Sequence, residues 1–231
     1  VNMRLEEEAS GGQPPPLSLA VGLVNLTGAC HRLGRIDDAI KYNAMAIDRL
    51  RPLDVPPARL FLAAAIEARG NILSQLNRHP EALQALAESG ALAAQLANMG
   101  VQGAPQLLTE IFVASSRAAF KAGNPLEAMR MSQNAADVAW DRYEKNPQGD
   151  REAIAHFVAA QMNLVGFAEV AGKYSQAEDA LFKALRIAGP DPRIVARGKQ
   201  FYEALQKLDD DKLEAGTVSY THLTLPTSDL V

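Results

Sequence analysis

The chain has 231 residues, of which 48% are hydrophobic and only 6% aromatic, and 23 basic against 27 acidic residues give it a formal net charge of −4. This balance excludes the basic field with which nucleic-acid-binding proteins hold phosphates, so we expect no nucleic-acid partner. The single cysteine, Cys30, excludes an intramolecular disulfide framework and a cysteine-based zinc site, and we expect it in the core. Alanine-rich, aromatic-poor sequence favours closely packed helices over sheets.

Residues 1–16 are first acidic and then rich in glycine and proline, which predicts a flexible lead. From Leu17 the apolar residues recur at alternating spacings of four and three, as on one face of a helix. Gly34 ends this predicted helix, and a second stripe from Ile36 to Leu50 predicts its partner. Two amphipathic helices joined by a tight turn form an antiparallel hairpin.

The same spacing of apolar residues recurs in three later segments, each of which predicts the first helix of another hairpin. In all four hairpins an alanine stands near the start of the second helix. These corner alanines are Ala39, Ala82, Ala128 and Ala177. The period therefore grows from 43 to 46 to 49 residues, and the chain contains an internal repeat. The recurring apolar positions of the four first helices form one pattern, which we call the apolar lattice. Three of its positions hold polar residues instead, namely Arg69, Ser115 and Gln161.

Helix caps support these boundaries. Asn124 followed by Pro125 predicts a capped helix start in the third repeat, and Pro80-Glu81 plays the same part in the second. Ser175 with Glu178 predicts a capping box in the fourth. Asp191-Pro192 opens a final helix to about Leu208, which we expect to cover the last hairpin.

The sequence thus predicts an all-α fold, a solenoid of four antiparallel helix hairpins plus a C-terminal capping helix. We expect the lead over residues 1–16, the repeat domain over 17–208 and a disordered tail over 209–231. From about residue 217 the tail differs in character, and residues 218–227 resemble translated sequencing-adapter read-through, which predicts a metagenomic fragment rather than native sequence. A native disordered tail is the alternative.

Residues that fit one family pattern, most of them small, stand around each corner. They are Gly34, Ala39 and Ala46; Gly70, Asn77 and Ala82; Gly123, Ala128 and Ala135; and Gly172, Tyr174, Ala177 and Ala184. In this the chain resembles the tetratricopeptide-repeat (TPR) family over residues 17–208, and the resemblance implies that the predicted solenoid is a right-handed superhelix. Its period exceeds the 34 residues usual in that family, so a long-helix, TPR-like solenoid is the better description.

No motif for catalysis is present: the sequence has no glycine-rich phosphate loop, no HExxH and no GxSxG. His31, His79 and His156 fall in different hairpins. We therefore predict no enzyme, with no catalytic, cofactor-binding or metal-ligating residues and no cofactor. No run of 18 apolar residues occurs, which predicts no membrane span and a cytoplasmic protein.

The resemblance implies a protein-interaction scaffold that binds a peptide or a partner protein on the concave face formed by the first helices. Polar positions and one aromatic residue are expected on that face. They are Asn25, His31, Arg32, Glu67, Asn71, Gln75, Arg117, Phe120, Lys121, Asn163 and Glu169. The competing interpretation is that they form the solvated side of amphipathic helices. Self-association through the solenoid ends is a further expectation, and the alternative function is a regulatory or ligand-sensing arm of a larger transcription regulator or signalling enzyme.

Overall fold

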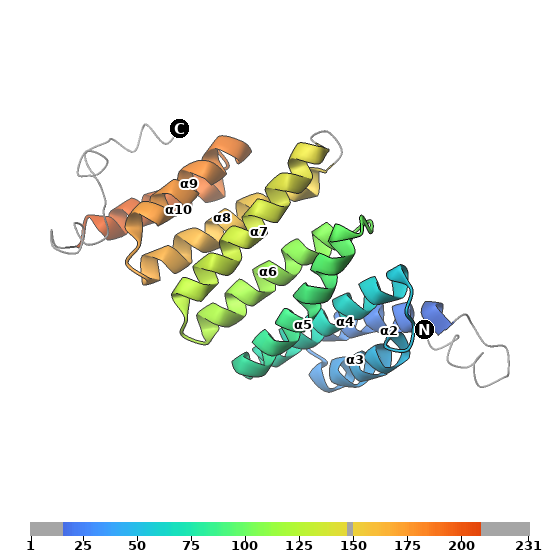
Figure 1. Cartoon of the computed structure of the whole chain (residues 1–231). Coiled ribbons are helices and arrows are strands. Elements are labelled where there is room, and N and C mark those ends of the chain that lie inside the picture. Colours follow the sequence, from blue (N-terminus) through green and yellow to red (C-terminus); the bar gives the residue numbers. More distant parts are fainter. Residues whose placement is uncertain (1–15, 147–149, 209–231) are drawn as a thin grey trace. The chain divides into compact units, whose positions relative to one another are not determined.

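The computed structural model describes residues 16–146 and 150–208, and every regular element within these ranges is an α-helix (Figure 1). The predicted all-α fold class is therefore confirmed. Except for Pro16, the predicted lead lies outside the described residues. So does the tail over 209–231, including the stretch that resembles adapter read-through, which stays a prediction.

The chain divides into two compact units, one ending at Ala122 and the other beginning at Gly123, and each is described by itself. Unit 1 contains α2 (Pro16–Arg32), α3 (Ile36–Leu50), α4 (Pro56–Gln75), α5 (His79–Asn98) and α6 (Ala104–Lys121). Unit 2 contains α7 (Pro125–Lys145), α8 (Arg151–Val170), α9 (Tyr174–Ala188) and α10 (Pro192–Leu205). This helix order matches the four predicted hairpins and the final helix, with the third turn falling at the boundary between the units.

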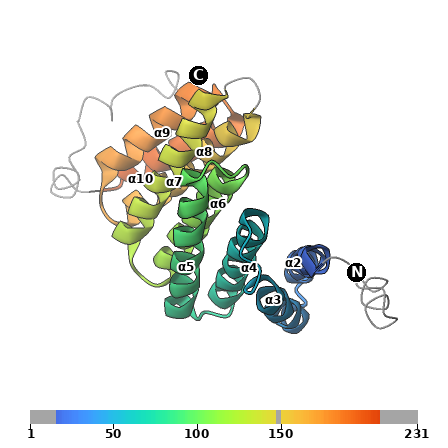
Figure 2. The same cartoon turned by 45° about the vertical axis from the view of Figure 1, so that its right-hand side comes forward.

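Unit 1 is held together by small side chains that let its helices approach closely. Helices α2 and α3 pair, α4 and α5 pair, and α6 packs on both α5 and α4 (Figures 1 and 2). Cys30 is 3% exposed and packs with Ala39 and Ile72, so its predicted place in the core is confirmed. The predicted apolar face of the first helix is wrong at its last position. Leu33 follows the end of α2 at Arg32, and it is 73% exposed.

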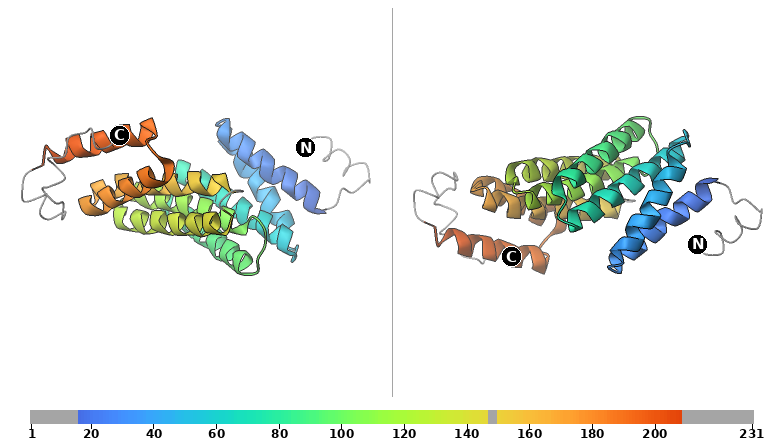
Figure 3. Two further views of the ribbon diagram at one scale, coloured as in Figure 1. Left: turned by 90° about the horizontal axis from the view of Figure 1, so that it is seen from above. Right: turned by 90° about the horizontal axis from the view of Figure 1, so that it is seen from below.

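Unit 2 is built around α8, which packs against α7 on one side and α9 on the other. Helix α10 lies along α9, as the orange-red ribbon in Figure 3 shows. Phe201 and Leu205 of α10 are buried, and Gly198 brings α10 so close to Leu181 that an added Cβ would lie 3.1 Å from its Cδ2. The prediction that a final helix covers the last hairpin is confirmed.

Within the described part of the chain, α8 is long and apolar enough to cross a membrane by length and composition alone. Core helices pass the same test, and α8 packs between two neighbours with Phe157, Leu164 and Val165 buried. Its apolar character is accounted for by this packing.

The four corners share one backbone geometry. Five residues before each corner alanine stands a residue with positive φ: Gly34 at 71°, Asn77 at 60°, Gly123 at 80° and Gly172 at 68°. Glycine and asparagine tolerate this left-handed conformation, which ends a helix. Each corner alanine is fully buried and donates its N–H to the carbonyl four residues back, at 2.9 to 3.1 Å. The turn prediction holds at every repeat.

Only some of the helix caps predicted from the sequence are present in the structure. Asn124 caps α7 as predicted, since its side chain accepts the N–H of Glu127 at 3.1 Å, and Asp191 caps α10 in the same manner. The capping box at Ser175 is wrong: α9 begins one residue earlier, at Tyr174, and no side chain caps it.

Pro80 likewise stands inside α5, which begins at His79 and has no side-chain cap. An ion pair between Arg78 and Glu81 crosses that corner instead. These differences arise because the left-handed residue, rather than a cap, sets the first residue of the second helix.

Candidate functional site

The predicted binding residues converge best between α4 and α6 of unit 1. Glu67 and Asn71 lie one turn apart on α4, and the Asn71 amide donates to the Glu67 carboxylate. Helix α6 packs against α4 and brings the charges of Glu110 and Arg117 close enough to act on Glu67. We call Glu67, Asn71, Glu110 and Arg117 the α4–α6 cluster.

Glu67 is the electrostatically perturbed member of this cluster. Partial burial is the main cause that raises its pKa, from the ordinary 4.5 to about 7. The hydrogen bond from Asn71 and the charge of Arg117 lower the pKa, while the charge of Glu110 raises it. Desolvation disfavours the charged carboxylate, and no ion pair compensates for it within the described residues. The site thus holds a proton-accepting group that titrates near neutral pH.

The other predicted residues of unit 1 do not join this cluster through any described hydrogen bond. Asn25, Arg32, Gln75 and Lys121 are exposed, whereas His31 and Phe120 are half-buried. His31 keeps its Nε2 atom buried without a hydrogen-bond partner in the described part of the chain. Whether these side chains bind a partner remains a prediction.

In unit 2 the predicted residues are Asn163 and Glu169 of α8, both half-buried. Glu169 forms an ion pair with Arg197 of α10, and burial lowers the pKa of that arginine. The capping helix therefore engages a carboxylate that the sequence placed on a binding face.

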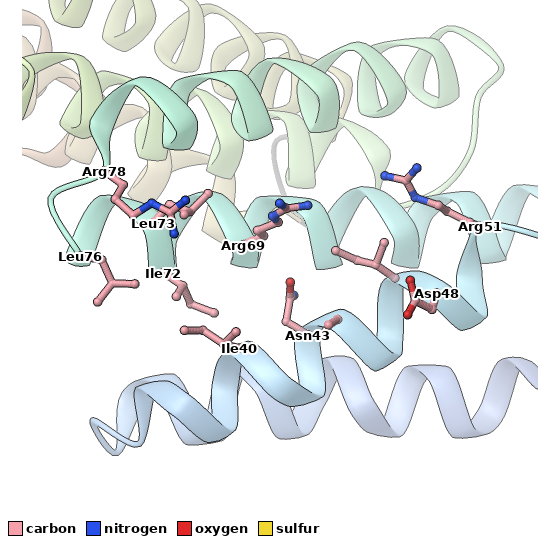
Figure 4. A pocket seen from close by; sticks show the side chains of 11 residues that line it. Ile40, Asn43, Asp48, Arg51, Arg69, Ile72, Leu73, Leu76 and Arg78 are labelled. Atoms are coloured by element: carbon pink, nitrogen blue, oxygen red, sulfur yellow. The ribbon is translucent and has the colours of Figure 1, made fainter.

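A groove that sequence reasoning did not single out lies between α3 and α4, with a volume of about 390 Å³ (Figure 4). Asn43 and Arg69 project into its middle, Asp48 and Arg51 lie toward one end, and Ile72 lies toward the other. Asn43 is 3% exposed and donates its side-chain N–H to the Ala65 carbonyl at 2.8 Å, which ties α3 to α4.

Arg69 is the distinctive residue of this groove. It is exposed and has no hydrogen bond or ion pair within the described residues, although its charge helps to lower the pKa of Glu81 behind the larger effect of Arg78. Arg51, by contrast, pairs with Glu88 at 3.5 Å. The sequence already set Arg69 apart, because this arginine occupies a position of the apolar lattice that holds leucine in the first and fourth repeats.

Comparison with solved structures places this geometry among helical-repeat folds. The crystal structure of a Rap protein complexed with Competence and Sporulation Factor matches with a TM-score of 0.59 and 16% identity, covering 94% of this chain and 54% of that one. The chain thus spans about half the length of the Rap protein. The structure of the APC/C hetero-tetramer Cut9–Hcn1 aligns at 18% identity over 91% of this chain and 42% of that one. Its TM-score of 0.35 is too low to indicate a shared fold.

The likeness to the Rap structure confirms a TPR-like helical-repeat fold. Comparison with curated proteins finds no match. A family model described as a family of unknown function, DUF6483, matches residues 80–221, which is more than half of the chain. The chain belongs to this family.

Proposed function

We propose that this protein is an interaction scaffold that binds an extended segment of a partner protein across the first helices of unit 1. The observation that carries the proposal is Glu67, a half-buried carboxylate with a pKa raised to about 7 and no ion pair in the described residues. A partially desolvated carboxylate without an ion-pair partner is stabilised when a ligand supplies a cation at hydrogen-bond distance, because charge-assisted hydrogen bonds are the stronger class.

The chemistry of the α4–α6 cluster defines the segment that fits. A lysine or arginine of the partner, or consecutive backbone N–H groups, would pair with Glu67. Arg117 is exposed, and its guanidinium would donate to a carboxylate or a backbone carbonyl one or two residues further along the segment. The preferred segment is therefore extended and carries a basic residue beside an acidic or carbonyl group.

The matched fold supports this class of function. The Rap protein is known in complex with Competence and Sporulation Factor, and it shares the helical-repeat fold at low identity. Solenoids of helix pairs offer extended surfaces suited to binding. By this analogy we propose recognition of a partner molecule rather than turnover of a substrate, with no cofactor.

The test measures binding of the full chain to a synthetic library of extended peptides that vary in charge and in the position of the basic residue. We expect enrichment of sequences with one lysine or arginine, and Kd values that weaken about tenfold for Glu67→Gln, the loss expected of one charge-assisted hydrogen bond. Arg117→Ala is expected to weaken the same peptides.

The matched control is Lys199→Ala, which removes an exposed charge on α10 and should leave every Kd unchanged. If the enriched peptides bind Glu67→Gln and Arg117→Ala as tightly as the unaltered protein, the α4–α6 cluster is not the binding site. If no library member binds above background, the scaffold proposal itself fails.

A second candidate function is a regulatory, ligand-sensing arm of a larger protein. It is favoured by a pocket in unit 2 that contains two cations and a buried amide oxygen for which the described residues offer no hydrogen-bond partner. The gene distinguishes the two functions: a DNA-binding or catalytic domain in the same reading frame supports the sensing arm, and its absence from the complete reading frame contradicts it.

A further inference from the structure

Unit 2 contains a pocket of about 350 Å³ formed by three helices. Helix α7 contributes Gln133, Asp137 and Trp140; helix α8 contributes Phe157 and Gln161; and helix α9 contributes Lys183, Arg186 and Ile187. The volume is in the range of small-molecule sites, roughly 300 to 1,000 Å³. None of these residues belongs to the α4–α6 cluster or to the groove between α3 and α4.

One wall of the pocket is aromatic and fixed in orientation. The ring of Trp140 lies 5.3 Å from that of Phe157, centroid to centroid, and 5.4 Å from that of Tyr143. The indole N–H of Trp140 donates to Glu144 at 2.8 Å, which holds the plane of the ring. Of these aromatic residues Trp140 and Phe157 line the pocket, and with Ile187 they offer a rigid apolar surface to a flat ligand.

The charges around the pocket favour an anion. Lys183 and Arg186 are exposed on α9 and have no hydrogen bond or ion pair within the described residues. The one acidic residue lining the pocket is Asp137, which accepts the side-chain N–H of Gln133 at 2.7 Å. Two cations against one carboxylate leave a net positive charge.

Gln161 supplies the independent sign of a ligand. It is 1% exposed, it lines the pocket, and its Oε1 atom is buried without any hydrogen-bond partner among the described residues. Buried side-chain amides in folded proteins are nearly always hydrogen-bonded, because an unpaired one loses its hydration without compensation. Rotation of the amide about its last bond can present either its oxygen or its nitrogen to a bound molecule.

We propose that this pocket binds a small aromatic carboxylate. The aromatic body lies against Trp140 and Phe157, and the carboxylate is held by Lys183 and Arg186. The side-chain N–H of Gln161, turned into the pocket by rotation of the amide, donates to the same carboxylate. The site is independent of the proposed partner surface in unit 1, so either can fail without the other.

The sequence has a single tryptophan, so the indole ¹⁵N–¹H resonance of Trp140 reports on the pocket without ambiguity. The probe is 3-phenylpropionate, titrated into the full chain, and we expect a saturable shift of that resonance with a Kd on the order of 0.1 to 1 mM. Its neutral isostere, 3-phenylpropanamide, tests the charge, and acetate tests the need for the ring. Both should bind at least about tenfold more weakly.

Three variants locate the ligand's contacts. Lys183→Met with Arg186→Met removes both cations while keeping their apolar stems, and should weaken binding of 3-phenylpropionate about tenfold or more. Gln161→Met replaces the amide by an apolar side chain of similar shape and should weaken binding about three- to tenfold. Lys199→Met is the matched control and should leave the Kd unchanged.

The ¹⁵N–¹H spectrum of each variant verifies that unit 2 remains folded. The proposal is overturned if 3-phenylpropionate gives no saturable shift, if the neutral amide binds equally well, or if the cation variants keep the original Kd. A peptide that ends in phenylalanine is a further arm: if it binds and the free carboxylate does not, the pocket takes a chain terminus and the small-molecule assignment is wrong.

Discussion

Replacing Glu67 by glutamine tests the electrostatics of the α4–α6 cluster directly. Glutamine keeps the size of the side chain and can still interact with Asn71, but it carries no titratable proton. The comparison between the two proteins therefore isolates one carboxyl group, because every other ionisable group is common to both.

The magnitude follows from the pKa of Glu67, which rises from 4.5 to about 7 on folding. Between these values the folded chain holds a proton that the unfolded chain has released, so the free energy of unfolding falls as the pH rises through this window. Each pKa unit corresponds to about 1.4 kcal/mol, which gives a total of up to roughly 3 kcal/mol. Below about pH 4.5 the full stability is present, and above about pH 7 the loss is complete.

Denaturant unfolding at half-unit steps from pH 4.5 to pH 8.5 measures this effect. We expect Glu67→Gln to match the unaltered protein at the acid end and to exceed its unfolding free energy by roughly 2 to 3 kcal/mol at pH 8. Glu203→Gln, an exposed carboxylate on α10, serves as the control and should leave the pH profile unchanged. Parallel profiles for Glu67→Gln and the unaltered protein across the whole range would refute the reasoning.

Four further substitutions test the packing, each by the free energy of unfolding in denaturant. An added Cβ at Gly70 would lie 2.6 Å from a leucine side chain of α5, so Gly70→Ala should lower the free energy of unfolding by about 1 to 3 kcal/mol. Gly166 has open space around it, so Gly166→Ala should raise the free energy of unfolding by about 1 kcal/mol. Gly172→Ala places a side chain at φ 68° and should cost about 1 to 2 kcal/mol. Tyr202→Phe removes an O–H that donates to the buried Glu178 at 2.6 Å and should cost about 1 to 2 kcal/mol, with no change expected if this bond contributes nothing.

The corners could be predicted from sequence because their causes are local. A glycine or asparagine that accepts positive φ and an alanine five residues later fix the turn, and both are visible in the sequence. The start of α9 was missed because Ser175 is a good capping residue in isolation, while the turn at Gly172 had already set the first helical residue to Tyr174. The turn at Gly172 therefore determined where the helix begins, and the capping preference of Ser175 did not.

The candidate sites were less predictable because their properties depend on residues distant in sequence. Burial and the charge of Glu110 of α6 raise the pKa of Glu67, and neither cause can be derived from the residues close to Glu67 in sequence. Two of the three breaks in the apolar lattice nevertheless marked pockets: Arg69 lines the groove of unit 1, and Gln161 lines the pocket of unit 2. Ser115, the third, is simply buried in α6. A polar residue at an apolar repeat position is thus a sign of a site only when the fold opens a cavity beside it.

The shared geometry of the corners bears on how such a chain can change over evolutionary time. Each turn is closed by hydrogen bonds between residues close in sequence, and so it does not depend on the length of the helices that it joins. Insertions near the linkers, such as the one between α5 and α6, can therefore lengthen a repeat while the joint is inherited unaltered. The period can therefore lengthen from 43 to 49 residues along the chain while all four corners keep one backbone geometry.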